Sequence, residues 1–319
     1  MKISVAFIVY NGAKYMRTQL DSILAQTHKV DEIIVCDDAS SDNTKEILEE
    51  YKNKYPDLLF IYYNNKNLGP TKNIEKAIEA CTGDIILLTD QDDYWETNKV
   101  ETIFKWFVAN PTMNGVFTSG SLMNSNGEID NKYGLWDVMS FPYNKVNNSQ
   151  DLKLYINTVE NSVTGATLAI KNNLPFLKQP FPVIKHLVHD RWVAINLAEN
   201  NSLGILEEKL IHYRIHSEQA IGGMTENVEK YIELNANLLE GKPNINNNIA
   251  SFKDLRYILN KIEINLEIQN EILKIESKSF NNTKYINTLK NKHKVYLEYG
   301  FVKWPILSGL RKFKKLFTA

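Results

Sequence analysis

The chain has 319 residues, of which 43% are hydrophobic and 24% charged, a composition typical of a globular protein with a large core. Its 37 basic and 38 acidic residues leave a formal net charge of -1, which excludes a global cationic field for holding nucleic acid. No uninterrupted run of about 18 apolar residues predicts a membrane-spanning helix.

From the start to about residue 107, short β-branched apolar runs alternate with amphipathic stretches of helical period. This alternation predicts an α/β fold, a sheet with helices on its faces. We expect strands at 3–9, 32–36, 58–63 and 84–89. We expect a helix at 15–25, a second that ends at Tyr51, and a third that begins at Pro70 or Thr71.

Between residues 115 and 215 the pattern is less regular, with strands predicted at 116–119, 164–170 and 210–215 and a helix at about 190–199. After Gly222 and Gly223 the sequence becomes rich in Asn, Lys, Glu and Leu and keeps a helical period to Leu297. We therefore predict a first domain at 1–222 and a helical second domain at 223–319.

The last segment, 301–319, carries five basic residues and no acidic one, with apolar residues at helical spacing. A basic amphipathic helix of this kind can lie on anionic lipid, which would give peripheral membrane contact. It can equally pack against a second copy of the chain, which would give a homo-oligomer through the helical domain. Both alternatives stay open.

The two cysteines, Cys36 and Cys81, lie beside apolar runs. This placement indicates reduced, buried thiols instead of a disulfide framework, and it favours a cytoplasmic location.

Polar residues follow all four predicted strands of the first half, where the loops of an open α/β sheet converge and bind ligands. They are Tyr10 to Gly12, residues 37–42, residues 64–69 and residues 90–93. One such cluster alone predicts a helix cap or a turn. Four in succession favour a ligand site.

Three carboxylates, those of Asp90, Asp92 and Asp93, come directly after the apolar strand at 84–89. They would repel one another without a cation, so we expect Mg²⁺ or Mn²⁺, with a nucleotide diphosphate as co-ligand. The chain has no Gly-x-x-x-x-Gly-Lys loop and no Gly-x-Gly-x-x-Gly after the first strand, which disfavours ATPase and dinucleotide-binding interpretations.

In order and spacing, these segments resemble glycosyltransferase family 2, whose GT-A fold is a Rossmann-like mixed sheet that binds nucleotide-diphospho-sugars. The segments are Val9 to Gly12, Asp37 to Thr44, Asn67 to Gly69, Gly83 to Trp95 and, more weakly, His189 to Trp192 and Tyr213 to His216. The resemblance covers roughly residues 1–220 and implies a donor-binding half at 1–110 and an acceptor half at 111–222.

The resemblance implies roles on the donor side. Asp38 would accept a hydrogen bond from the base, Asn67 would help to hold the base, and Asp90 would face the ribose. The remaining implied nucleotide-sugar contacts are Val9, Asn11 and Lys72. Lys72 would pair with the diphosphate, although its spacing from Asn67 is about two residues shorter than the commonest family pattern.

The resemblance also implies a metal site and a catalytic base. Asp92 would bind the metal, and His216 would be a further metal ligand or a diphosphate contact. Asp190 would deprotonate the acceptor hydroxyl, although a carboxylate at a helix N-terminus is also a good cap. Trp95 and Trp192 could stack on sugar faces, with core packing as the alternative for each.

The sequence therefore predicts an inverting glycosyltransferase that moves a sugar from a UDP-hexose to a glycan, glycolipid or glycoprotein acceptor, for a bacterial surface polysaccharide or adhesin. A dTDP-rhamnose donor is the alternative, because residues 90–95 also resemble members labelled rhamnosyltransferases. A nucleotidyltransferase would need a Gly-rich basic loop after the first strand, which residues 10–14 do not supply. A non-catalytic nucleotide-binding assembly protein is the alternative outside enzymes.

Overall fold

The computed structural model describes residues 1–146, 148–158 and 161–216, together with positions 232, 264, 265, 267, 268, 271 and 272. Apart from those single positions, the predicted helical domain lies outside the described residues, and so does its basic tail at 301–319. Among the described residues, no helix combines the length and the apolar character needed to cross a membrane.

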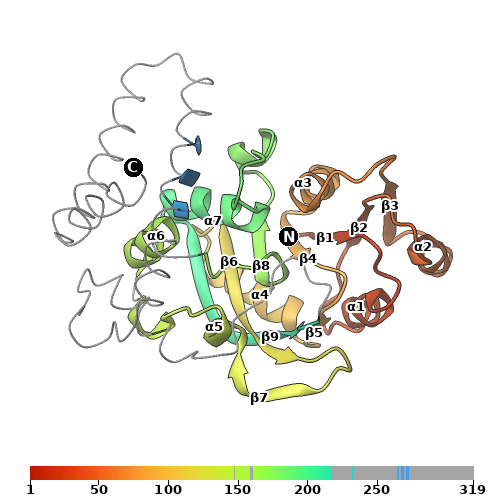
Figure 1. The fold of residues 1–319 in the computed structure, drawn as a ribbon, viewed down its shortest axis with the longest axis horizontal. Helices are drawn as coiled ribbons and strands as arrows, with labels where there is room; N and C mark the ends of the chain where they lie inside the picture. Colours follow the sequence, from red (N-terminus) through yellow and green to blue (C-terminus); the bar gives the residue numbers. More distant parts are fainter. Residues whose placement is uncertain are drawn as a thin grey trace, which may run out of the picture.

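The described strands form one mixed sheet (Figure 1). They are β1 (Ile3–Val9), β2 (Glu32–Asp37), β3 (Leu59–Tyr63), β4 (Ile85–Thr89), β5 (Tyr94–Trp95), β6 (Gly115–Met123), β7 (Ile129–Gly134), β8 (Leu168–Lys171) and β9 (Leu203–Arg214). Their order is β3-β2-β1-β4-β8-β6-β9-β5, and β7 pairs with β6 off this path. The first four strands are parallel to one another, and β8 runs antiparallel to both β4 and β6. The predicted α/β mixed sheet is confirmed.

Seven α-helices lie within the described ranges. They are α1 (Met16–Leu24), α2 (Thr44–Lys54), α3 (Pro70–Ala80), α4 (Lys99–Ala109), α5 (Leu135–Val138), α6 (Ser149–Thr158) and α7 (His189–Glu199). Pro70 stands at the first turn of α3, where its fixed φ and missing N–H cost nothing.

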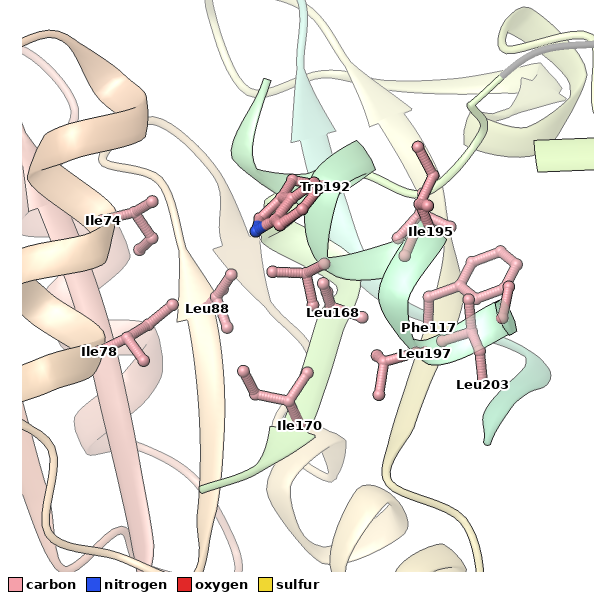
Figure 2. Close-up of a cluster of buried hydrophobic side chains, with 14 of the residues drawn as sticks. Ile74, Ile78, Leu88, Phe117, Leu168, Ile170, Trp192, Ile195, Leu197 and Leu203 are labelled. Carbon is pink, nitrogen blue, oxygen red and sulfur yellow. The ribbon is translucent and has the colours of Figure 1, made fainter. Parts of the chain in front are cut away.

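The two faces of the sheet carry separate apolar clusters, because side chains alternate along each strand. On β1, Phe7 joins the cluster that α1, α2 and α4 cover, and Ile8 joins the cluster that α3 and α7 cover. In Figure 2, which shows part of the second cluster, Ile74 and Ile78 of α3 point toward Leu88 of β4. This packing holds the loops after the parallel strands along one edge of the sheet.

The regular first half matches its predicted elements to within a few residues, whereas the second half differs more. Residues 165–167 form a short 3₁₀ helix, η2 (Gly165–Thr167), so the strand predicted at 164–170 begins only at Leu168. The strand predicted at 210–215 is the end of the longer β9. Both differences arise because long-range pairing with β4 and β6, and not local periodicity, decides where these strands run.

Three described positions from the C-terminal part pack on this domain. Ile268 and Ile272 are buried in the cluster of α3 and α7. Asn265 is also buried and accepts a hydrogen bond from Arg191 of α7. These contacts place residues of the C-terminal part against the helix that also carries Asp190.

Candidate active site

The loops after β1 and β2 are joined by hydrogen bonds. The backbone N–H of Asn11 donates to Ser40 Oγ at 2.8 Å, and Asn11 Oδ1 accepts from the N–H of Ser41 at 2.8 Å. Asn11 adopts a φ of 50°, a left-handed conformation that asparagine tolerates well. Val9 is buried, and its carbonyl accepts from the N–H of Asp38 at 2.8 Å. Val9 and Asn11 therefore lie at one corner with Asp38.

Asp38 is buried beneath the loop that precedes α3. Its carboxylate accepts from the N–H groups of Leu68 and Gly69 at 2.8 and 2.9 Å, and from Asn64 Nδ2 at 2.9 Å. Asn67 is exposed, and its side chain accepts from the N–H of Gly69 at 3.0 Å. Asp38 thus fixes the conformation of this loop, while Asn67 stands at its surface.

Lys72, in the first turns of α3, is paired within its own helix. Its Nζ lies 2.6 Å from Glu75 Oε2, and the same oxygen accepts from the N–H of Phe181 at 3.1 Å. Glu75 therefore joins α3 to the segment around Phe181 and pairs with the cation to which the resemblance gave a diphosphate.

The acid residues after β4 meet the end of β9. His216 Nε2 lies 2.9 Å from Asp92 Oδ2, and both side chains are mostly buried. Asp93 is buried and accepts from the N–H of Arg214 at 3.0 Å. Two residues that are 124 positions apart, Asp92 and His216, are thus in direct contact.

The carboxylate of Asp90 is desolvated by the surrounding protein. Burial, followed by the nearby charges of Asp92 and Asp190, raises the pKa of Asp90 to about 7. Burial also raises the pKa of Asp93 well above its ordinary value. The acid cluster therefore disfavours further negative charge unless a cation is bound.

Asp190 stands in the first turn of α7. It is 9% exposed, and its carboxylate accepts from Asn161 Nδ2 at 3.2 Å and from the N–H of Arg191. Burial raises the pKa of Asp190 to about 7, against the lowering effect of these hydrogen bonds. The charge of Asp190 in turn contributes to the raised pKa of Asp90.

The residues of the loop after β4, residues 90–93, fit a hard divalent cation. We call this segment the acid loop. In the described part of the chain no group of three or more His, Cys, Asp or Glu side chains is arranged as a metal cluster. Asp92 and His216, however, are in contact, and Mg²⁺ commonly takes one or two protein ligands and completes its shell with water and phosphate oxygens. Asp92 and His216 supply that smaller donor set.

The two predicted sugar-stacking residues are both packed in the protein interior. Trp95 has no exposed surface, and Lys99 Nζ lies 4.1 Å from the centre of its ring. In this conformation Trp95 offers no face to a sugar, so core packing accounts for it. Trp192 is 9% exposed and belongs to the cluster shown in Figure 2.

Three residues that hold the site together had no role in the sequence analysis. Lys99 is buried, donates to the carbonyl of Ala166 at 2.7 Å, and has its pKa lowered to about 7 by burial. Arg214 Nε donates to the carbonyl of Asp92 at 2.7 Å. Gln91 bonds to the backbone of Tyr10. Sequence features could have pointed to all three residues. Arg214 and Gln91 lie inside the segments that resemble the family, and Lys99 precedes Ile103 and Phe107 at helical spacing.

Comparison with protein families places these residues in context. The family model described as "Glycosyl transferase family 2" matches residues 4–164 of this chain. An uncharacterized glycosyltransferase of Nostoc sp. is 29% identical over 221 residues, covering 68% of this chain and 65% of that protein. The chondroitin synthase of Escherichia coli is 32% identical over 139 residues, covering 43% of this chain and 20% of that protein.

Solved structures share the fold. Staphylococcus aureus TarS in complex with UDP-GlcNAc superposes with a TM-score of 0.52 at 18% identity, covering 83% of this chain and 81% of that one. A mannosyltransferase from Pyrobaculum calidifontis in complex with GDP-Man and Mn²⁺ also gives a TM-score of 0.52, at 17% identity, covering 95% of this chain and 86% of that one.

Proposed function

This chain is an enzyme of glycosyl transferase family 2, and on that premise we propose that it transfers a hexose from a UDP-sugar to a glycan, glycolipid or glycoprotein acceptor with inversion. The observation that carries the proposal is the contact of Asp92, after β4, with His216, after β9, beside Asp90, whose pKa the charge of Asp190 on α7 helps to raise. A donor and an acceptor hydroxyl brought to this edge of the sheet would lie among all four side chains.

The loops after β1, β2 and β3 would hold the nucleotide. Asn11 and Asn67 present side chains at the surface of these loops, and Asp38 fixes the backbone between them. A carboxylate has about four acceptor positions, so Asp38 keeps capacity for a bond from the base beside the three bonds it already accepts. Lys72 would reach a diphosphate by exchanging its partner Glu75 for phosphate oxygens.

Asp92 and His216 would hold Mn²⁺ or Mg²⁺, with Asp90 beside them facing the ribose. When bound, the metal would stabilise negative charge that develops on the departing diphosphate. Arg214 would keep this loop in place, because its Nε donates to the carbonyl of Asp92 and its backbone N–H donates to the carboxylate of Asp93.

Asp190 would take the proton of the attacking acceptor hydroxyl. Its pKa of about 7 matches the requirement that a general base accept a proton near neutral pH and be ionised often enough to do so. Asp190 comes from α7 and the proposed metal ligands come from other elements, so different parts of the site would hold the base and the leaving diphosphate, as attack from the face opposite the diphosphate requires. A single displacement of this kind inverts the anomeric centre.

The donor and acceptor classes rest on the relatives. The chondroitin synthase and the TarS complex with UDP-GlcNAc support a UDP-sugar and a cell-surface polysaccharide. The match spans 65% of the first relative and 20% of the second, so the full activity of those proteins is not transferred to this chain. A dTDP-rhamnose donor remains the alternative on the residues of the acid loop.

Release of nucleotide diphosphate tests the proposal. The protein is incubated with separate UDP-, dTDP- and GDP-sugars, each with Mn²⁺ and with excess EDTA, and the released nucleotide is measured. We expect release from a UDP-hexose that requires the metal. Release from dTDP-rhamnose alone would select the alternative donor, and nucleotide binding without release from any donor would support the non-catalytic assembly protein.

A further inference from the structure

The side-chain amide of Gln91 pairs with the backbone of Tyr10, which lies in the loop after β1. Gln91 Nε2 donates to the carbonyl of Tyr10 at 2.9 Å, and the N–H of Tyr10 donates to Gln91 Oε1 at 2.8 Å. The primary amide of Gln91 supplies both the donor and the acceptor that this arrangement needs. We call these two hydrogen bonds the Gln91–Tyr10 amide pair.

Gly12 makes room for this amide. A Cβ atom at Gly12 would lie 2.5 Å from Gln91 Oε1 and 2.9 Å from Val9 Cγ1. Gly12 is not among the glycines with positive φ, so space and not backbone freedom is what requires glycine here. On the other side of the loop, the N–H of Gly12 donates to Thr44 Oγ1 at 2.8 Å. The loop after β1 is thus held between α2 and the acid loop.

The amide pair joins two loops that carry different functions in the proposed reaction. The loop after β1 carries Asn11, whose bonds to Ser41 connect it to the nucleotide side. The acid loop carries Asp92 directly after Gln91, and Asp92 contacts His216. The two bonds of the amide pair therefore fix the spacing between these loops.

We propose that Gln91 is a positioning residue that sets the distance between the nucleotide-binding loop and the metal ligand Asp92, so that the base and the diphosphate of one donor are bound together. The inference rests on the proposed function, since it assumes a nucleotide-diphosphate ligand. It assigns Gln91 no contact with the donor and no part in proton transfer.

The first test replaces Gln91 by methionine, which keeps the length of the side chain and removes both hydrogen bonds. The N–H and carbonyl of Tyr10 can then turn to water, because this residue is exposed. We expect the Kd of UDP with Mn²⁺, measured by isothermal titration calorimetry, to rise about tenfold, as for the loss of one to two solvent-compensated hydrogen bonds. The KM for the donor should rise in parallel with little change in kcat.

The matched control is Gln179→Met, an exposed glutamine on the loop after η3 (Pro175–Lys178). It should leave the Kd of UDP unchanged. Thermal unfolding of both variants, followed by circular dichroism, checks that each is folded. A change in kcat at constant KM in Gln91→Met would contradict a positioning role.

The second test is a double-mutant cycle with Gly12→Ala, whose Cβ would displace the amide of Gln91. Both changes break the same amide pair, so their effects should not multiply. The Kd of UDP for the double variant should lie within about threefold of the Kd for whichever single variant binds UDP more weakly. Multiplicative effects, giving about a hundredfold loss, would overturn the inference. If the wild-type protein binds UDP and Gln91→Met binds it equally well, the inference fails alone; if the wild type binds no nucleotide diphosphate, the proposed function itself fails.

Discussion

The loop after β2 and the start of α7 each hold a buried carboxylate, Asp38 and Asp190, in different surroundings. After β2, Asp38 is buried and accepts hydrogen bonds from two backbone N–H groups and one side-chain amide. In the acceptor half, burial outweighs the hydrogen bonds to Asp190 and raises its pKa to about 7. The bonds to Asp38 therefore serve to fix a loop, whereas Asp190, like Asp90 and Asp93 of the acid cluster, is a buried carboxyl that holds a proton more readily than an ordinary one.

The largest effect is expected from Asp92→Asn, which removes a charge that the donor side needs and leaves the fold intact. The amide keeps the size of the side chain, but it binds a hard cation far more weakly than a carboxylate does. We expect turnover to fall to background and the response to Mn²⁺ to disappear, measured as release of nucleotide diphosphate over a metal titration.

Asp57→Asn is the matched control for that change, since Asp57 is exposed on the turn before β3. The control should keep full activity and the same metal dependence. Full activity of Asp92→Asn, or of the wild type in excess EDTA, would remove Asp92 from the metal site.

The second-largest effect is expected to be a loss of transfer without a loss of donor binding. Asp190→Asn should lower transfer by about 10²–10⁴-fold, the range typical of losing a general base. Binding of UDP with Mn²⁺, measured by calorimetry, should stay near the wild-type value, because Asp190 lies on α7 and outside the donor loops. A collapse of donor affinity would instead make Asp190 a donor contact.

The same contrast separates what the sequence predicts from what it does not. The strands and helices of the donor half are local patterns, so β1 is predicted to the residue and the acid loop follows from the run at 84–89. The partner of a side chain is a long-range property. The hydrogen bond from the N–H of Phe181 to Glu75, and the burial of Trp95, depend on elements that meet only in the folded chain.

A third effect is the pH dependence that the buried base should produce. A carboxyl must be ionised to accept a proton, so kcat/KM should fall about tenfold for each pH unit below about 7, the pKa of Asp190. Among the neighbouring groups, Arg191 lowers the pKa of Asp190. The charge of Asp190 in turn raises the pKa of Asp90. The measurement is kcat/KM for the acceptor from pH 5 to pH 9.

Asn161→Leu sharpens that measurement. Asn161 donates to Asp190 and so lowers its pKa, which means that the leucine variant should move the acidic limb of the profile to higher pH. Activity above the shifted limb should recover. A limb that stays in place in this variant would assign it to a group other than Asp190.

The smallest effect is expected from Trp192→Phe, which asks whether the acceptor half uses this ring for packing or for sugar. The indole N–H of Trp192 is buried without a hydrogen-bond partner among the described residues, as is that of Trp136 in the same cluster. Removing an unpaired N–H relieves a desolvation cost, while the smaller ring loses some packing. For Trp192→Phe, and for Trp136→Phe as its matched control, the net change in unfolding free energy should therefore be within about 1 kcal/mol.

Transfer activity then decides the role of Trp192. If the ring only packs, Trp192→Phe and Trp136→Phe should both keep transfer within about twofold of the wild type, because neither substitution touches Asp190 or the acid loop. A loss of transfer confined to Trp192→Phe, at unchanged stability and unchanged UDP binding, would show that this ring contacts the acceptor. Such a result would extend the acceptor half from a single buried base to a surface that recognises sugar, since Trp192 follows Asp190 by two residues at the start of α7.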